Sequence, residues 1–291
     1  MNLLLTLIFA FFILLLGIVP FGLLYPFSNV VRYVLCCVFG YRKEVMRKNL
    51  AASFPDLSPK ERKELLWKAY LNLTDVILEG IKAFSMPRRQ INKRHHITNT
   101  EALQPYFQNG QSMIVVASHY ANWEWGSLSA DLQLPFNIVA FYKPLSNRWL
   151  DKLVRWSRSR HGTHMASIYH TAETFEAYKN TPTLFIMVAD QSPSKKQVKN
   201  SYWIPFLGQQ TAFLYGPEKY ARAYDLPMGY THINRIKRGY YTVSFELLPS
   251  HLSELPEGLP TRIYAQKIEE VIRRQPANWL WSHRRWKHTP S

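Results

Sequence analysis

The spacing of the hydrophobic positions changes several times along this chain, and each change marks a different kind of element. The first apolar stretch, residues 3–24, contains no charged residue and is rich in Leu, Ile and Phe. As one helix it would be about 33 Å long, which is enough to cross the hydrocarbon core of a bilayer. A cleaved signal peptide is the competing interpretation, but no basic region precedes the stretch and no clear cleavage site follows it. We therefore predict a retained membrane anchor over residues 1–24.

The residues around this stretch set its expected orientation. Arg and Lys residues are frequent after it, whereas only the amino terminus precedes it. The positive-inside rule then places the rest of the chain in the cytoplasm. Gly17, Pro20 and Gly22 are expected to kink the anchor or to let it lie partly in the interface, so single-pass and monotopic arrangements both stay open. Residues 25–57 are interpreted as a juxtamembrane segment that is first apolar and then basic.

A helical pattern begins after Ser58. Ser58 and Glu61 form a capping-box sequence with Pro at the first helical position. Apolar residues recur at helical spacing from there to about Phe84, so we predict one long amphipathic helix. Pro87 ends this helix. The basic run that follows, residues 88–94 with His95 and His96, is either a solvated loop or a contact with lipid phosphate or an acidic partner.

Later in the chain, short apolar runs that suit buried strands alternate with helical patterns. This alternation, with no internal repeat and no low-complexity linker, predicts one α/β domain over residues 58–291. In such sheets the reactive groups lie at the carboxyl ends of the strands, and His119, Lys143 and Asp190 each follow a predicted strand. The expected strands are residues 113–117, 137–142, 183–188, 228–236 and 240–248, and the expected helices are residues 101–107, 147–160, 171–178, 211–222 and 262–274.

Composition narrows the class of partner. The formal net charge is +16, so the chain is expected to be drawn to nucleic acid, anionic lipid headgroups, phosphorylated substrates or an acidic protein. Nucleic acid is the least expected partner, because neither a basic helix-turn-helix nor an RNP aromatic motif is present.

The two cysteines, Cys36 and Cys37, are adjacent and form neither a disulfide framework nor a metal knuckle, so we expect no metal site.

His119 and Glu124 are the candidate reactive pair. A histidine at the end of a strand, with a carboxylate five positions later at the start of a helix, can form a general base with its orienting partner. The simpler interpretation is a core histidine beside an exposed glutamate. Gly-rich phosphate loops, HExxH and GxSxG are all missing, and Ser118 is discounted because an adjacent Ser–His pair rarely has triad geometry. A base without a protein nucleophile favours direct transfer of an acyl group to a hydroxyl.

His119 and Glu124 are separated by four residues, and Asn122-Trp123 lie between them, so this stretch has the form HxxxxE. This motif resembles that of the lipid A late acyltransferases of the lysophospholipid-acyltransferase-like superfamily. The glycerolipid branch usually has Asp at the end of the motif and a later Phe-Pro-Glu-Gly-Thr block, which this chain lacks. Matching blocks extend over nearly the whole chain: Tyr41-Arg42-Lys43, Lys48-Asn49-Leu50, Phe54-Pro55, Ala189-Asp190-Gln191, Pro205-Phe206-Leu207-Gly208 and Trp281-Ser282-His283-Arg284-Arg285-Trp286-Lys287.

The resemblance implies a glycerolipid-acyltransferase-like fold, with a mixed sheet flanked by helices and an N-terminal anchor helix. It implies an O-acyltransferase at the cytoplasmic face of the inner membrane that acylates a hydroxyl of a lipid A precursor. The donor would be acyl carrier protein, or coenzyme A, without a further cofactor or a covalent acyl-enzyme. The partners would be acyl carrier protein, an anionic glycolipid acceptor and the membrane. Another membrane glycolipid or an aminolipid is the alternative acceptor.

The resemblance also assigns residues. Arg158 and Asp190 match essential family positions, although a surface arginine and a helix-capping aspartate are the simpler interpretations. Relatives commonly have Tyr-Arg-Pro where this chain has Tyr142-Lys143-Pro144, and Lys lacks the bidentate fork of Arg. The cationic residues near the C-terminal Trp residues are expected either at headgroup level or in a packed terminal segment. The implied catalytic residues are His119, Glu124, Arg158 and Asp190, and the implied substrate-binding residues are Asn122, Lys143, Gln191, Arg284 and Arg285.

Overall fold

The computed structural model describes residues 2–249 and 252–290. Its centre is a mixed seven-stranded sheet in which β9 and its neighbour β1 run opposite to the other strands. This arrangement confirms the predicted α/β fold, and each of the five expected strands forms. The order across the sheet is β1 (His95–Ile97), β9 (Tyr240–Leu247), β8 (Met228–Lys237), β2 (Met113–Ala117), β5 (Thr183–Val188), β3 (Asn137–Tyr142) and β4 (His164–Ser167).

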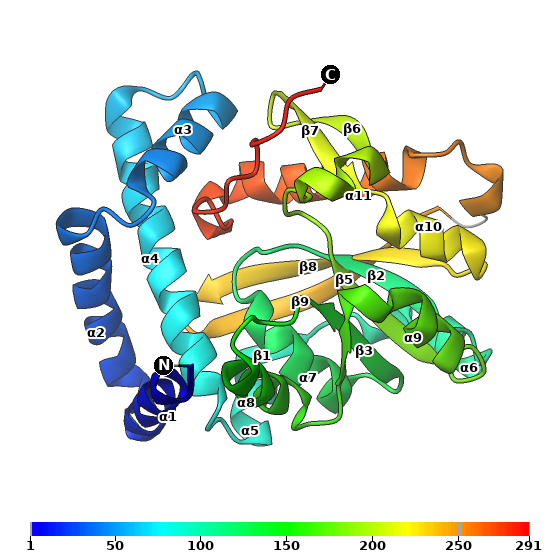
Figure 1. Cartoon of the computed structure of the whole chain (residues 1–291), viewed down its shortest axis with the longest axis horizontal. Helices are drawn as coiled ribbons and strands as arrows, with labels where there is room; N and C mark the ends of the chain where they lie inside the picture. Colours follow the sequence, from blue (N-terminus) through cyan, green and yellow to red (C-terminus); the bar gives the residue numbers. More distant parts are fainter. Residues whose placement is uncertain (1, 250–251, 291) are drawn as a thin grey trace.

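Helices cover both sides of this sheet (Figure 1). On one side, α7 packs against β1 and β3; on the other, α10 and α11 pack against β2 and β8. The buried strand β2 has all five residues inside the core, as its continuous apolar run predicts. The helices after the N-terminal region are α5 (Arg88–Arg94), α6 (Gln104–Gln108), α7 (Gly126–Gln133), α8 (Arg148–Ser159), α9 (Thr171–Ala177), α10 (Gly216–Ala223) and α11 (Leu259–Arg274).

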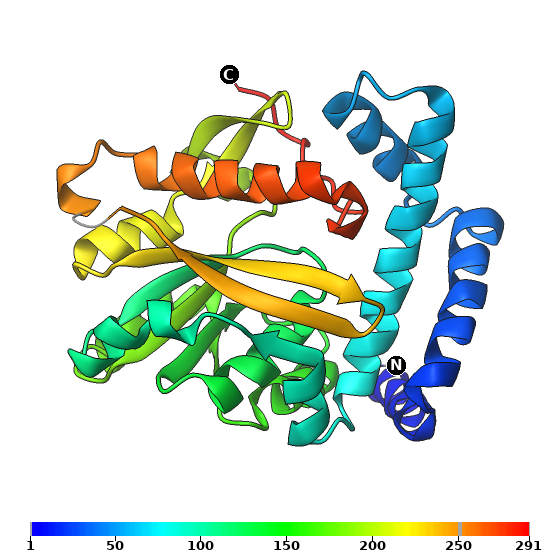
Figure 2. The same ribbon diagram turned by 180° about the vertical axis from the view of Figure 1, so that it is seen from behind.

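The predicted long helix is α4 (Pro59–Ala83), and it lies between the N-terminal helices and the sheet (Figure 1). Its capping box forms as expected: the backbone N of Glu61 donates to Ser58 Oγ, and the backbone N of Ser58 donates to Glu61 Oε2 at 2.8 Å. In the view from behind, Figure 2 shows that the β8–β9 hairpin extends to this helix on the side away from the N-terminal helices. α4 is therefore the element that joins the N-terminal region to the sheet.

The N-terminal region differs from the single anchor helix that was predicted. It forms α1 (Asn2–Ile18) and α2 (Phe21–Tyr33), which are separated at Pro20, where ψ is 147°. The helix is interrupted there because Pro has no N–H to donate to the preceding helical turn. A turn of π-helix extends α2, so the helix that is long and apolar enough to cross a membrane is Phe21–Val38 rather than residues 3–24. Many large apolar side chains of α1 and α2 are exposed, while both helices pack against α4.

The predicted juxtamembrane segment, residues 25–57, contains a helix, α3 (Lys43–Ser53). One further segment was misassigned by local pattern. The helix expected from residue 211 begins only at Gly216, because residues before it form β7 (Gln209–Leu214), which pairs with β6 (Ser201–Phe206). The turn between the strands has positive φ at both Leu207 and Gly208, as a two-residue hairpin turn requires.

Candidate active site

The register of the central strands brings His119 and Asp190 together. β2 and β5 are parallel neighbours, and Ala117 lies opposite Val188 at their ends. Two residues beyond each strand end, His119 Nδ1 lies 2.6 Å from Asp190 Oδ1. The backbone N of His119 also donates to Asp190 Oδ2 at 2.9 Å. The expected meeting of these two residues at the carboxyl edge of the sheet is confirmed.

Asp190 is held as a carboxylate inside the protein. It is only 2% exposed, and it accepts a third hydrogen bond from Trp279 Nε1 at 2.8 Å. Burial alone would raise the pKa of Asp190, but the charge and hydrogen bonds of His119 and the Trp279 N–H bring this pKa below its usual value. A carboxylate on Nδ1 keeps the proton there and leaves Nε2 as the basic atom.

Gln191 lies directly beside that basic atom. Its Nε2 is 3.0 Å from Nε2 of His119, a geometry in which the amide donates to the imidazole lone pair. The imidazole side chain is 18% exposed, so the remaining approach to it is open to solvent. Gln191 thus occupies the position from which a hydroxyl group could reach His119.

Glu124 pairs with Arg158 and not with His119. Among the described residues, Glu124 accepts from Arg158 Nη2 at 2.9 and 2.7 Å and from Arg158 Nε at 3.3 Å. The predicted orienting bond from Glu124 to His119 is therefore wrong in its partner, since Asp190 holds Nδ1. The guanidinium of α8 offers a carboxylate a bidentate partner, which an imidazole cannot match.

The turn that carries His119 is braced by the C-terminal segment. The backbone N of Ala121 donates to the carbonyl O of Asn278 at 2.8 Å, and that of Leu280 donates to the carbonyl O of His119 at 3.1 Å. Ala121 is buried at a φ of 50°, a strained conformation for a residue with a side chain. This strain persists because the surrounding hydrogen bonds determine the path of the turn.

Asn122 has a structural role, so its assignment as a substrate-binding residue is wrong. It is completely buried, its Nδ2 donates to Glu79 Oε2 at 2.7 Å, and its Oδ1 accepts from the backbone N of Trp125 at 3.1 Å. The second bond caps the 3-10 turn Trp123–Trp125 that carries Glu124. Asn122 therefore positions the motif instead of touching substrate.

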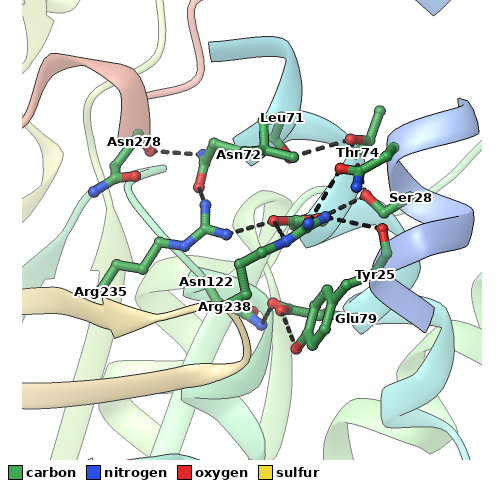
Figure 3. Close-up of polar contacts among 12 residues, drawn as sticks. Tyr25, Ser28, Leu71, Asn72, Thr74, Glu79, Asn122, Arg235, Arg238 and Asn278 are labelled. Atoms are coloured by element: carbon green, nitrogen blue, oxygen red, sulfur yellow. Dashed lines mark hydrogen bonds and ion pairs between the residues drawn. The ribbon is translucent and has the colours of Figure 1, made fainter. Parts of the chain in front are cut away.

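Glu79 of α4 is the centre of a buried polar network that the sequence patterns did not reveal (Figure 3). Besides Asn122, it accepts hydrogen bonds from Tyr25 of α2 at 3.0 Å and from Tyr241 of β9 at 2.7 Å. Burial raises the pKa of Glu79 to about 7, although the hydrogen bond from Tyr241 opposes this shift. One carboxyl group thus joins the apolar N-terminal helices, the sheet and the turn that carries His119.

Asp75 extends the same network one helical turn earlier. It is fully buried and accepts hydrogen bonds from Ser28 of α2, at 2.6 Å, and from Arg235 and Arg238 of the β8–β9 hairpin. The sequence signal for this network was two carboxylates four positions apart, Asp75 and Glu79, on either side of the apolar run Val76-Ile77-Leu78. Such a pair is neighbouring on a helix and is buried only when partners compensate its charge.

We expect Glu79→Gln to destabilise the fold by about 1–3 kcal/mol, because a glutamine has one acceptor oxygen fewer for three donors. Glu79→Leu should cost more, since it leaves the Tyr25, Tyr241 and Asn122 donors all without an acceptor. Chemical denaturation of the detergent-solubilised protein measures both. Glu64→Leu, on the exposed face of the same helix, is the control and should shift stability by less than about 0.5 kcal/mol. Equal losses for Glu64→Leu and Glu79→Leu would contradict the network's role.

An apolar cavity of about 490 Å³ lies beside the reactive residues. Its volume is within the range of small-molecule and lipid-chain sites. One wall is formed by α4 from Leu73 to Phe84, a distance of about 16 Å along the helix. Glu124, Arg158 and His283 provide polar groups in the lining, and Trp123, also in the lining, packs edge-on against the His119 ring at 5.2 Å. The cavity therefore brings an apolar wall and the Glu124–Arg158 pair together beside the His119 ring.

The other residues assigned from the resemblance lie in different environments. Lys143 lies at the same sheet edge but is exposed, and Arg284 is exposed on the C-terminal segment. Arg285 is 2% exposed and stacks over the Phe213 ring at 4.4 Å, so its predicted place at headgroup level is wrong. Trp281 is also buried, which confirms the packed alternative for this part of the segment. The outward or inward direction of neighbouring side chains depends on packing that the local sequence does not specify.

Comparison with known proteins agrees with this arrangement. The chain is 24% identical over 256 residues to a lipid A biosynthesis lauroyltransferase of Escherichia coli strain K12, and the match covers 86% of this chain and 80% of that protein. It has the same identity and coverage with a lipid A biosynthesis palmitoleoyltransferase of that strain. A lipid A biosynthesis acyltransferase of Haemophilus influenzae is 23% identical over 257 residues, covering 86% of this chain and 78% of that protein. The family model described as bacterial lipid A biosynthesis acyltransferase matches residues 2–288. The chain therefore belongs to the bacterial lipid A biosynthesis acyltransferase family.

Proposed function

We propose that this protein transfers a fatty acyl chain from a thioester donor, acyl carrier protein or coenzyme A, directly to a hydroxyl of a lipid A precursor. The observation that carries this proposal is the His119–Asp190 pair beside an apolar cavity with a guanidinium in its lining. A base of this kind activates a hydroxyl, and the cavity suits a fatty chain. No acyl-enzyme is required, because the acceptor oxygen itself attacks the thioester.

His119 is the proposed general base. The acceptor hydroxyl replaces the Gln191 amide at Nε2, and Nε2 takes the hydroxyl proton as the oxygen bonds to the thioester carbonyl carbon. The tetrahedral intermediate then collapses, the C–S bond breaks, and the imidazolium returns the proton to the leaving thiolate. Asp190 stabilises the imidazolium and keeps the imidazole in the correct orientation.

Arg158 is the proposed oxyanion partner, and Glu124 is a positioning residue for it. The two side chains are each 28% exposed, and Arg158 is part of the cavity lining. A guanidinium fixed by a bidentate carboxylate keeps its position while charge develops on the carbonyl oxygen, and such a preorganised donor is effective in a site with little water. Glu124 thereby contributes to catalysis through Arg158.

The N-terminal helices are the proposed membrane contact. α1 and α2 expose large apolar side chains, and Phe21–Val38 is long enough to span. The excess of basic residues after these helices supports a catalytic domain on the cytoplasmic side of the inner membrane. The net charge of +16 would also attract an anionic glycolipid and an acidic carrier protein.

We expect Phe9→Ala to shift donor preference towards longer chains. Phe9 of α1 is part of the cavity lining and packs edge-on against Phe84 at 5.9 Å. Removing its ring makes room for about two more methylene groups, and at about 0.8 kcal/mol each the preference should change about tenfold. Competition between donors of different length measures this. Phe12→Ala, which removes an exposed ring of the same helix outside the cavity lining, should leave the preference unchanged.

The direct test of the proposal is transfer by the purified protein from acyl carrier protein and from coenzyme A thioesters to a lipid A precursor. We expect mass spectrometry to show one added acyl chain and the release of one thiol per product. Transfer to another glycolipid or to an aminolipid, with none to the lipid A precursor, would favour the alternative acceptor. Thiol release without an acylated lipid would contradict acyl transfer to a membrane lipid.

A further inference from the structure

The C-terminal segment forms part of two cavities. Its residues up to His283 line the apolar cavity described above. Its residues from Arg284 onward line a second cavity of about 450 Å³, together with α3 and Gln209 at the start of β7. The segment is bonded directly to the reactive turn, because the backbone N of Leu280 donates to the carbonyl O of His119. A ligand in the second cavity would therefore be placed relative to His119 through one short stretch of chain.

This stretch is held rigidly. Asn49 Nδ2 of α3 donates to the carbonyl O of Trp281 and to that of His283, both at 2.9 Å. At the other end, Trp286 Nε1 donates to Thr211 Oγ1 at 2.8 Å. The side chain of Arg284 consequently projects from a backbone fixed on both sides. Preorganisation of this kind lowers the entropy that binding costs.

The second cavity is cationic. Lys48, Arg284 and Lys287 line it, all three are exposed, and within residues 2–249 and 252–290 none of them forms an ion pair or a side-chain hydrogen bond. The carboxylate in the lining is Glu44, which lies 3.4 Å from Arg47. Unpaired like charges around one space repel one another, and an anion between them relieves that repulsion.

One lining residue, Gln209, carries a polar group without a partner among the described residues. Gln209 Nε2 is buried and has no hydrogen-bond partner among the described residues. An unpaired buried N–H group costs free energy, which an acceptor oxygen from a ligand would recover. The lining therefore presents three exposed cations, a set that matches the several oxygens of a phosphate group, and Gln209 would add an amide donor if its side chain turned towards the ligand.

We propose that this second cavity binds a phosphate group on the headgroup of the acceptor lipid, with Arg284 as its principal contact. The inference rests on the proposed function and adds a subsite to it. A volume of about 450 Å³ suits a phosphorylated sugar better than a single small ion. Phosphate recognition on the segment bonded to His119 would set which acceptor hydroxyl reaches Nε2. The competing occupant of the cavity is the phosphate group on the thiol-bearing arm of the acyl donor.

The test compares equilibrium binding of two acceptors to the full-length protein in detergent, with His119→Ala present to prevent turnover. The acceptors are a phosphorylated lipid A precursor and the same lipid after enzymatic dephosphorylation. We expect Arg284→Gln to raise the Kd of the phosphorylated lipid about tenfold or more and to leave that of the dephosphorylated lipid unchanged. Arg284→Lys should restore part of the loss. Lys60→Gln removes an equal charge from an exposed position outside the cavities and should change neither Kd.

Three outcomes would overturn the subsite. One is an unchanged Kd of the phosphorylated lipid in Arg284→Gln, another is an equal loss for both lipids, and the third is a raised KM for the thioester donor in place of an effect on the acceptor. The melting temperature of each variant verifies that it is folded. Transfer by the protein with His119 intact is measured in parallel. A failure of transfer would contradict the proposed function, while the two binding constants would still decide whether the cavity recognises phosphate.

Discussion

Asp190→Asn is expected to lower kcat for acyl transfer by about 10²–10⁴-fold. Asn presents either an amide N–H₂ or a carbonyl to His119 Nδ1, whereas Asp190 now accepts from Nδ1, from the backbone N of His119 and from Trp279. With an amide donor at Nδ1, the proton moves to Nε2, and the imidazole can no longer accept the proton of a hydroxyl. His119→Ala should cause at least as large a loss, because it removes the base itself. Steady-state kinetics with saturating acceptor measure both.

The double variant His119→Ala with Asp190→Asn tests whether the two residues act together more directly than either single variant does. Residues that act as one unit have strongly non-additive effects, so Asp190→Asn should cost little further activity once His119 is Ala. Glu124→Gln should act differently, since Glu124 contacts Arg158. If the Glu124 and His119 effects merge in a double variant while those of Asp190 and His119 add, Glu124 is the orienting residue and our assignment fails. Melting temperatures separate catalysis from stability, because Asp190 is buried and its replacement disturbs three hydrogen bonds.

The same carboxylate contributes to stability in a predictable direction. The pKa of Asp190 is below its ordinary value in the folded protein. Its contribution is therefore complete above the ordinary aspartate pKa of about 3.9 and is lost as the pH falls through the lower folded value.

Arg158→Ala is expected to lower kcat by about 10²–10³-fold, with a smaller change in the KM of either substrate. The guanidinium is proposed to stabilise the oxyanion, which exists only after attack, so its loss affects the transition state more than ground-state binding. Arg155→Ala on the same helix removes the same charge from an exposed side chain and should retain nearly full activity. Initial rates at varied donor concentrations distinguish kcat from KM.

Arg158→Lys refines this assignment. Lys keeps the positive charge but lacks the fork that bonds both oxygens of Glu124, so we expect only partial recovery. Equal losses for Arg155→Ala and Arg158→Ala would refute a specific role for Arg158. A loss that appears in KM alone would instead make Arg158 a substrate-binding residue.

Much of the fold followed from local pattern. The apolar strand 113–117, the capping box at Ser58 and the alternation of strands with helices all formed as predicted. These features depend on neighbours a few residues away, because hydrophobic periodicity and capping act within one or two turns. The same local rules placed His119 and Asp190 at strand ends, and the parallel sheet then brought both to one edge.

The partners of the charged residues were decided only by tertiary structure. A five-residue spacing made Glu124 the apparent partner of His119, yet the register of β2 with β5 placed a carboxylate 71 positions away at 2.6 Å. Likewise, Arg284 is exposed while its neighbour Arg285 is buried, and Asn122 turned inward to Glu79. The physical reason is that the energy of burying a charge depends on partners from distant elements, which no local window contains.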